Sequence, residues 1–215
     1  MKKTLFVSLL LLVSGGIFAQ NEKLSKAIEA KLITIDTSQS VTELIEIANY
    51  FERISKAEPK EWLPFYYKAY SHIKIGNVYN LSGKPDLIDA QADEAEKYLD
   101  MLDKIAKPNS ETYCLRKMVA TLRIVADPMN RYPTFNPIAE EAMDMAQSLN
   151  PENPRIYLMK GLDKYFTPEQ FGGSKTEAKE LLGIAIAKFK AFKPETPVSP
   201  QWGLGQAQYF FSLIK

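Results

Sequence analysis

Histidine and cysteine are nearly missing from this sequence, since each occurs once among 215 residues, as His72 and Cys114. One cysteine excludes an intramolecular disulfide. No second histidine or cysteine stands at ligand spacing from either residue, so no zinc site, other metal site or cofactor is expected. No Gly-x-Ser-x-Gly turn accompanies His72 to supply a hydrolase nucleophile. We interpret His72 as a partly exposed helix residue and Cys114 as a small residue of the core.

An excess of charge of either sign is missing as well. The chain carries 27 basic and 26 acidic side chains, which leaves it nearly neutral. Proteins that bind nucleic acid or an anionic membrane surface usually present a strongly basic face. The composition therefore gives no support for either kind of partner.

Long apolar runs are missing except at the N-terminus. Two lysines follow the initial methionine, an apolar run comes next, and the small residue Ala19 ends the segment. This order predicts a secretory signal peptide over residues 1–19, and hence an exported protein, periplasmic or secreted. The run is shorter than the ~20 residues that a membrane-spanning helix needs. A lipid anchor is not expected either, because no cysteine lies near the predicted cleavage site. Residues 20–215 are expected to form one domain.

Helical periodicity runs through the rest of the chain. Leu44, Ile47, Phe51 and Ile54 recur at steps of three and four, which places them on one face of a helix. No run alternates apolar and polar residues for long enough to predict a strand. We therefore predict an all-α protein, with helices over residues 41–58, 87–105, 112–125, 137–149, 155–166, 174–192 and 200–214.

Residues that favour helix starts stand between these segments. Ser40 and Ser174 each precede a glutamate by three residues, the spacing of a capping box. Further starts are predicted at Asn136-Pro137, Asn153-Pro154 and Ser199-Pro200. The stretch "QFGGSKT" can also be compared with a phosphate-binding loop, but such a loop needs a longer glycine segment and a preceding strand. We interpret Ser174 as a helix cap and expect no nucleotide site.

Prolines that close helices recur along the chain. They are Pro59, Pro108, Pro151 and Pro194, separated by 49, 43 and 43 residues. Apolar residues precede two of these prolines at the same three distances: Ala139, Met143 and Ala146 before Pro151, and Ile47, Phe51 and Ile54 before Pro59. This recurrence predicts a repeated helical unit.

Tyr157 and Gly161 follow the third of these prolines in "NPENPRIYLMKG", and the whole pattern resembles the tetratricopeptide repeat (TPR). The resemblance covers roughly residues 40–215 and implies antiparallel helical hairpins stacked as a TPR-like α-solenoid. Because the spacing exceeds the family's usual period of about 34 residues, "NLSGKPDLID" and "DPMNRYPTFNP" are expected as insertions in hairpin turns. Gly161 is expected to allow close approach to Ala178 and Ala185 of the paired helix.

The resemblance also implies where a partner would bind, because the first helix of each hairpin lines a concave groove in this family. Phe65 and Ala69 align with packing positions and are expected in the core. Side chains that flank such positions are expected to contact the partner: Tyr66, Tyr70, Lys74, Asn153, Arg155, Leu158, Leu162 and Tyr165. An alternative remains open, in which the tyrosines pack against the amino-terminal helix.

Two functions agree with this pattern. The first is a non-catalytic exported scaffold that binds a peptide or protein partner in the cell envelope. The alternative is a periplasmic binding protein for a small apolar solute, associated with a transporter. An enzyme is not expected, because the acidic runs "ADEAEKYLD" and "AEEAMDM" lie opposite apolar stripes and are interpreted as solvated helix faces. An open groove would favour a partner chain, and an enclosed cavity a solute.

Overall fold

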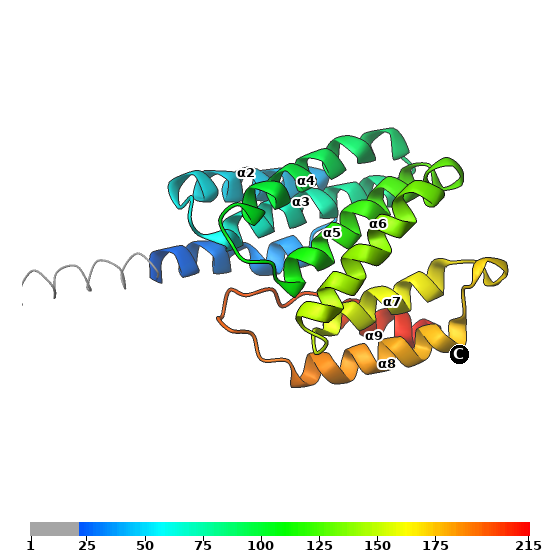
Figure 1. Ribbon diagram of the computed structural model, residues 1–215. Helices are drawn as coiled ribbons and strands as arrows, with labels where there is room; N and C mark the ends of the chain where they lie inside the picture. Colours follow the sequence, from blue (N-terminus) through cyan, green and yellow to red (C-terminus); the bar gives the residue numbers. More distant parts are fainter. Residues whose placement is uncertain (1–21) are drawn as a thin grey trace, which may run out of the picture.

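The computed structural model describes residues 22–215, which contain helices, turns and loops and no strand. The prediction of an all-α protein is therefore confirmed for this part of the chain. The predicted signal peptide, residues 1–19, lies outside it. A helix over residues 22–37 is followed, as Figure 1 shows, by α2 (Val41–Ala57), α3 (Trp62–Leu81), α4 (Ile88–Asp103), α5 (Ser110–Ala126), α6 (Pro128–Leu149), α7 (Pro154–Phe166), α8 (Lys175–Ala191) and α9 (Leu204–Leu213). Short 3₁₀ turns, Pro85–Leu87 and Glu169–Phe171, precede α4 and α8.

Consecutive helices pack against one another as pairs. The most extensive contacts join α2 to α3, α3 to α4, α5 to α6 and α7 to α8, while α3 also contacts α5 and α9 packs on α8. Phe65 and Ala69 are buried in the main core, as predicted. The stacking of the pairs as a TPR-like solenoid stays a prediction. None of the helices in the described residues combines the length and apolar character needed to cross a membrane.

Two glycines mark where helices approach most closely. A β-carbon built on Gly161 of α7 would lie 2.9 Å from Cγ of Leu182 in α8 and 3.3 Å from its backbone nitrogen. Gly76 of α3 faces Leu122 of α5 at a similar separation, 2.8 Å to Cδ1. The predicted close approach at Gly161 is confirmed, although the residue it meets is Leu182, which stands between the expected alanines, 178 and 185.

Three of the predicted helix caps form. The Ser40 hydroxyl accepts a hydrogen bond from the backbone N–H of Glu43 at 3.3 Å. The Ser174 hydroxyl accepts from Glu177 at 3.1 Å, which supports the interpretation of "GGSKT" as a turn between helices. The side chain of Asn153 accepts from the N–H of Arg155 at 3.0 Å, with Pro154 in the first turn. These bonds satisfy N–H groups that a helix start leaves without a partner.

The predicted helix start at Asn136-Pro137 is wrong, because α6 begins at Pro128 and continues through Pro133 and Pro137. An interior proline removes a helix hydrogen bond and costs about 3 kcal/mol. Packing along α5 offsets that cost, together with a paired contact in which Arg131 donates to both carboxylate oxygens of Asp89 at 2.6 and 2.8 Å. The segment "DPMNRYPTFNP" is therefore mostly helix rather than an insertion in a turn.

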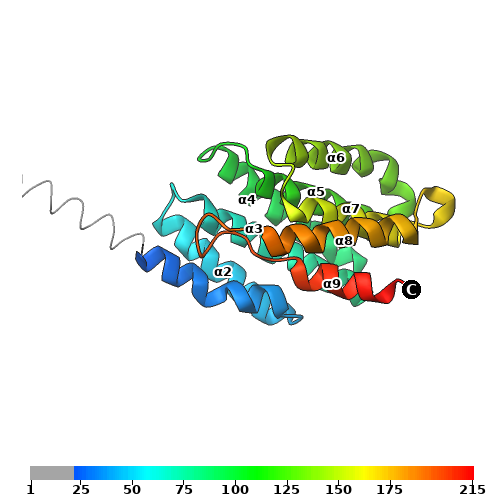
Figure 2. The same ribbon diagram turned by 90° about the horizontal axis from the view of Figure 1, so that it is seen from below.

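The predicted start at Ser199-Pro200 is also wrong, since α9 begins at Leu204 after Gly203, whose φ of +115° is left-handed. Residues 192–203 instead form a long connection that leaves α8 and returns to α9, the orange loop in Figures 1 and 2. We call this segment the C-terminal strap. Val198, Ser199, Pro200 and Trp202 of the strap are buried, because the strap lies against the first half of the molecule.

Candidate ligand-binding sites

The residues predicted to contact a partner are covered to different degrees. Tyr66, Tyr70, Asn153, Arg155 and Leu158 are buried, whereas Lys74, Leu162 and Tyr165 are partly exposed. Their assignment to a partner-binding surface stays a prediction. For a partner to contact the buried residues of this set, the part of the chain that covers them must first be displaced.

Trp202 of the strap brings Tyr66, Tyr70 and Arg155 together. Its indole N–H donates to the Tyr66 hydroxyl at 2.9 Å. Its ring stacks on Tyr70 with centroids 5.2 Å apart and an angle of 18° between the planes. Its other neighbour is the Arg155 guanidinium, whose central carbon lies 4.9 Å from the indole centroid. Residues of α3 and α7, far apart in sequence, therefore meet under one side chain of the C-terminal segment.

Arg155 is fully buried and only partly satisfied. Its Nη1 donates to the Glu111 carboxylate of α5 at 3.0 Å, and Asn153 donates to the same oxygen at 3.0 Å. Among the described residues, Nε and Nη2 of Arg155 have no hydrogen-bond acceptor. These two nitrogens form one edge of the planar guanidinium, the edge that matches a pair of acceptor oxygens. An unmet buried donor is costly, so this edge is a candidate contact for another group.

Burial has the largest effect on the pKa values of Glu111, Tyr66 and Tyr70. It raises the pKa of the Glu111 carboxyl above its usual range, although the Arg155 charge and three hydrogen bonds act in the opposite direction. Burial also raises the pKa of Tyr66 and of Tyr70 well above the ordinary phenol value. Both phenols therefore stay protonated and keep a proton to donate at neutral pH.

The amino-terminal helix closes the other side of Tyr70. Lys74 donates to the backbone carbonyl of Asp36 at 3.0 Å, at the end of that helix. Crowding by protein atoms raises the pKa of the Asp36 carboxyl even though part of the residue reaches solvent, while Lys74 and Tyr70 act in the opposite direction. Tyr70 thus lies beside the amino-terminal helix, as the alternative interpretation expected, and beside the strap, which the sequence did not predict.

Tyr165 belongs to a separate aromatic group at the other end of α7. Its ring meets Phe166 at 5.0 Å and Phe210 of α9 at 5.2 Å, in edge-to-face geometry. The Lys175 ammonium lies 3.2 Å from the Tyr165 centroid and donates to the Tyr165 carbonyl at 2.5 Å. Phe166 keeps 66% of its surface exposed, so this end of the molecule presents aromatic surface beside a cation.

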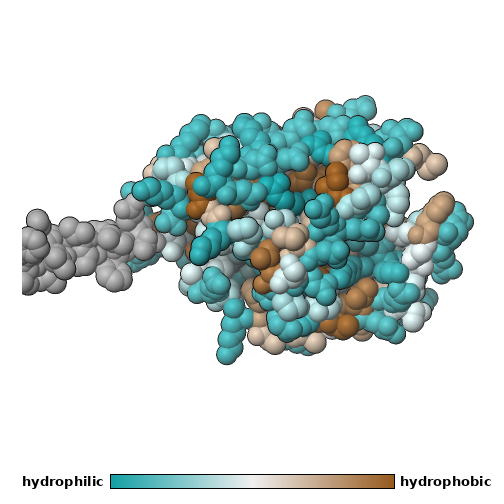
Figure 3. Space-filling view, viewed as in Figure 1, coloured by the Kyte–Doolittle hydropathy of each residue, from teal (hydrophilic) through white to brown (hydrophobic). Residues whose placement is uncertain are grey.

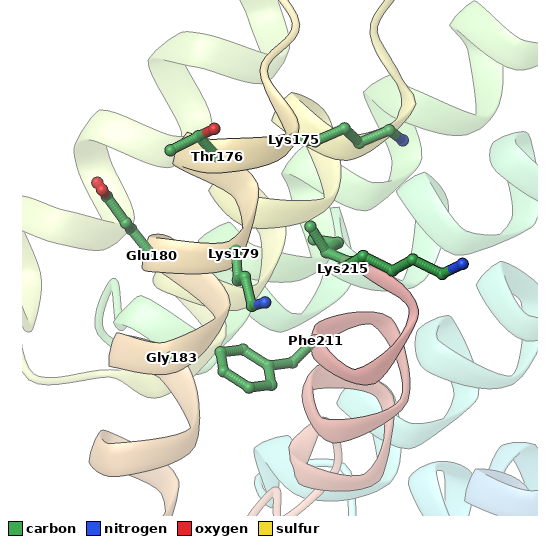
Figure 4. A pocket seen from close by; sticks show the side chains of 8 residues that line it. Lys175, Thr176, Lys179, Glu180, Gly183, Phe211 and Lys215 are labelled. Carbon is green, nitrogen blue, oxygen red and sulfur yellow. The ribbon is translucent and has the colours of Figure 1, made fainter.

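A cleft of about 490 Å³ lies next to this group, between the start of α8 and the end of α9. On the face shown in Figure 3, apolar residues form small separate areas rather than one continuous patch, so a defined cleft is the better candidate for a site. Phe211 points from α9 toward α8 with the Lys179 amine nearby, 5.7 Å from its centroid (Figure 4). The lining residues are Lys175, Thr176, Lys179, Glu180, Gly183, Phe211, Ile214 and Lys215.

The charges in this cleft favour an anion. Lys175, Lys179 and Lys215 form no ion pair with a carboxylate in the described residues, and Glu180 is the one acidic side chain of the lining. Phe211 and Ile214 supply an apolar surface between the cations. The arrangement suits an anion that also presents an apolar surface.

A second, smaller groove of about 320 Å³ lies among α4, α5 and α6. Its apolar lining includes Leu99, Val119, Phe135 and Ile138. Arg116 and Arg123 also line it, but each already pairs with two acids of the "ADEAEKYLD" segment and its continuation. That acidic face is therefore engaged with α5 rather than fully solvated. The paired arginines offer less attraction to an anion than the free lysines of the α8/α9 cleft.

The residues that carry metal or nucleophile chemistry are isolated. No group of three or more His, Cys, Asp and Glu side chains in residues 22–215 could hold a metal ion. His72 is half-buried and its Nδ1 lies 2.9 Å from the Gln91 side-chain oxygen. Cys114 is buried in the core, as predicted, and burial raises the pKa of its thiol well above the usual value.

Sequence reasoning missed Trp202 and the α8/α9 cleft. Trp202 follows a proline that was interpreted as a helix start, which placed the tryptophan on a helix face instead of in a strap. Lys175 and Lys179 stand four residues apart, so their common helix face was detectable from sequence. Their meeting with Phe211 was not, because it depends on how α9 folds back on α8.

Neither a known protein-family model nor a curated protein sequence matches this chain. The TPR resemblance therefore stays a prediction. Among solved structures, the chain is similar to the HusA haemophore from Porphyromonas gingivalis, with a TM-score of 0.76 and 29% sequence identity. The likeness covers 88% of this chain and 92% of that one. Nearly the whole all-α fold is thus shared with a protein described as a haemophore.

Proposed function

We propose that this chain is an exported, non-catalytic binding protein for a planar apolar ligand that carries carboxylates, with haem as the first candidate. The observation that carries this proposal is the likeness to the HusA haemophore over 88% of the chain. Of the two functions that agree with the sequence, the small apolar solute is the one this likeness favours. The predicted signal peptide supports export.

The α8/α9 cleft supplies the contacts such a ligand needs. Phe211 and Ile214 can cover one face of a porphyrin ring, and Lys179 and Lys215 can pair with its propionates. The exposed aromatic surface of Phe166 and Tyr209 extends the apolar area beyond the cleft. Aromatic contact provides most of the binding energy in this arrangement, while the lysines orient the ligand.

Recognition in this cleft would depend on the ring and its carboxylates rather than on iron. The lining contains no histidine, methionine or cysteine, the residues that usually ligate haem iron. Metal-free protoporphyrin IX should therefore bind about as tightly as haem. A porphyrin of similar size without carboxylates should bind more weakly.

The test is an absorbance titration of the mature chain with haem and with protoporphyrin IX. Replacing Lys179 and Lys215 together by glutamine should weaken both ligands by about tenfold, because each exposed ion pair contributes up to ~1 kcal/mol. Lys60→Gln with Lys84→Gln removes two exposed lysines outside the cleft and serves as the matched control. Octaethylporphyrin, which has no carboxylates, should bind both double variants equally.

Two outcomes would contradict the proposal. Absence of saturable porphyrin binding by the wild-type chain would remove the function. Equal porphyrin affinity in the two double variants would leave the function standing and move the site away from the α8/α9 cleft.

A peptide or protein partner remains the second candidate, favoured by the groove among α4, α5 and α6. Its apolar floor between charged rims suits an amphipathic segment better than a dianion, because its arginines are already paired. Ile138→Glu would place a carboxylate in this floor while changing an exposed position. Loss of a partner captured by the wild-type chain, with porphyrin binding intact, would support this candidate.

A further inference from the structure

The C-terminal strap contacts α3 through two residues that lie in turns, Val198 and Trp202. The Tyr67 hydroxyl donates to the backbone carbonyl of Val198 at 2.7 Å. Trp202 donates to the Tyr66 hydroxyl and stacks on Tyr70. The strap contains prolines at positions 194, 197 and 200. Tyrosine side chains that donate to a backbone carbonyl and stack on a tryptophan are contacts that a separate peptide of the same sequence can also make.

The strap is attached by few bonds. Apart from the backbone bonds by which Phe192 ends α8 and Gly203 begins α9, two hydrogen bonds, to Tyr66 and Tyr67, join the strap to the rest of the described chain. The other hydrogen bonds of residues 193–202 are internal, such as those between Thr196 and Ser199. The strap is therefore held mainly by its buried side chains, above all Val198 and Trp202, and removing one of them should let it open at a lower free energy than the whole fold.

The strap does not provide a hydrogen-bond acceptor for one edge of the Arg155 guanidinium. The Nε and Nη2 donors of Arg155 are buried near Trp202 and have no acceptor among residues 22–215. A peptide that placed a carbonyl or carboxylate oxygen on this edge would make contacts that the strap does not make. Such a peptide has a physical reason to replace the strap.

We propose that Tyr66, Tyr67, Tyr70 and Arg155 form a peptide-binding site that the strap occupies as an intramolecular ligand. The site accepts, from a partner, a proline-rich segment that carries a tryptophan. It lies on α3 and the start of α7, whereas the porphyrin cleft lies at the start of α8 and the end of α9. The two sites are independent, so failure of one leaves the other untouched.

The experiment uses a fluorescein-labelled peptide with the sequence of the strap, FKPETPVSPQWG, and the full mature chain. In the wild-type chain the tethered strap competes at a high effective concentration, so the peptide binds weakly. Trp202→Ala removes the stacking and the N–H bond from the strap only. The labelled peptide should then bind at least about tenfold more tightly than to wild type, because the competent open state is more populated.

Two controls separate recognition from a general loosening of the fold. A peptide with its tryptophan replaced by alanine should not bind the Trp202→Ala chain. Adding Tyr67→Phe to Trp202→Ala should weaken the parent peptide by about 3- to 10-fold, because it removes the donor to the Val198 carbonyl. Protoporphyrin IX binding should be the same in wild type and Trp202→Ala.

A second variant keeps the test decisive if Trp202→Ala does not fold. Trp202→Phe retains an aromatic ring on Tyr70 and removes the N–H bond to Tyr66, so it should raise peptide affinity by a smaller factor. If the folded variants bind the peptide no more tightly than wild type, the site is not a peptide-binding site and the proposal is wrong.

Discussion

Gly161 and Gly183 lie on neighbouring helices, α7 and α8, and differ in the room that each leaves for a side chain. A β-carbon on Gly161 would stand 2.9 Å from Cγ and 3.3 Å from the backbone nitrogen of Leu182. A β-carbon on Gly183 would meet only Cε2 of Phe211, at 3.5 Å, an ordinary contact distance. Both glycines are in helices, where alanine is intrinsically better by about 1 kcal/mol.

The balance between helix propensity and steric overlap decides whether each substitution raises or lowers the free energy of unfolding. Gly183→Ala gains the helix propensity without a clash and should raise the free energy of unfolding by about 0.5–1 kcal/mol. Gly161→Leu gains a similar propensity but forces α7 away from α8, and overpacking costs about 1–3 kcal/mol or more. The cost should fall at the upper end, since the Leu182 backbone cannot move aside as a side-chain end would, so we expect a net loss of about 1–2 kcal/mol.

Thermal and urea unfolding followed by circular dichroism would measure both changes. For a chain of this size 1 kcal/mol shifts the melting temperature by about 2–4 °C, so the two variants should move in opposite directions by a resolvable amount. Gly161→Ala should fall between them. A Gly161→Leu chain that melts at or above the wild-type temperature would refute the close packing of α7 on α8.

Three further predictions concern a cap, an ion pair and export. Ser174→Ala should lower the stability by ~1 kcal/mol in urea unfolding and leave porphyrin binding unchanged; loss of porphyrin binding would show that Ser174 does more than cap α8. Hydrogen bonds from Lys56 and Lys68 lower the pKa of the Glu52 carboxyl from about 4.5 in the unfolded chain to about 2 in the folded one. The charged carboxylate therefore stabilises the fold fully above pH 4.5, and this stabilisation is lost as the pH falls toward 2. Glu52→Gln should therefore destabilise at pH 7 by about 1–3 kcal/mol, because the buried Lys68 loses its partner, and the difference should vanish near pH 2; a constant difference across this range would contradict the assignment. Intact-mass measurement of protein from the cell envelope should find Gln20 at or near the amino terminus, whereas a full-length chain would contradict cleavage.

Helix periodicity and capping chemistry predicted most of the helical segments because both are local properties. Ser40, Asn153 and Ser174 form their caps from residues two or three positions away, and the sequence contains everything those bonds need. Pro133 and Pro137 were misleading because packing on α5, which no local rule includes, keeps them inside a helix.

The partner-binding role of Tyr66, Tyr70 and Arg155 stays a prediction, although the structure does bring these three side chains together around Trp202. What covers them is Trp202, which is separated from Tyr66 by 136 positions and is carried to it by the strap that leaves α8. The position of a long, weakly bonded connection depends on the whole fold, so residue spacing could not give it.

The contacts between α3 and the strap can form only after the strap has been synthesised, long after α3. The Tyr67–Val198 and Tyr66–Trp202 bonds span 131 and 136 residues, so they close some of the largest loops in the molecule. Until the strap is available, the side of Tyr66, Tyr67 and Tyr70 that Val198 and Trp202 cover has no intramolecular cover. A chain that emerges from its amino terminus would hold this aromatic surface open during synthesis or transport, when such surfaces are prone to aggregate. We therefore expect truncation before Trp202 to reduce the yield of soluble protein more than the loss of its two hydrogen bonds alone would explain.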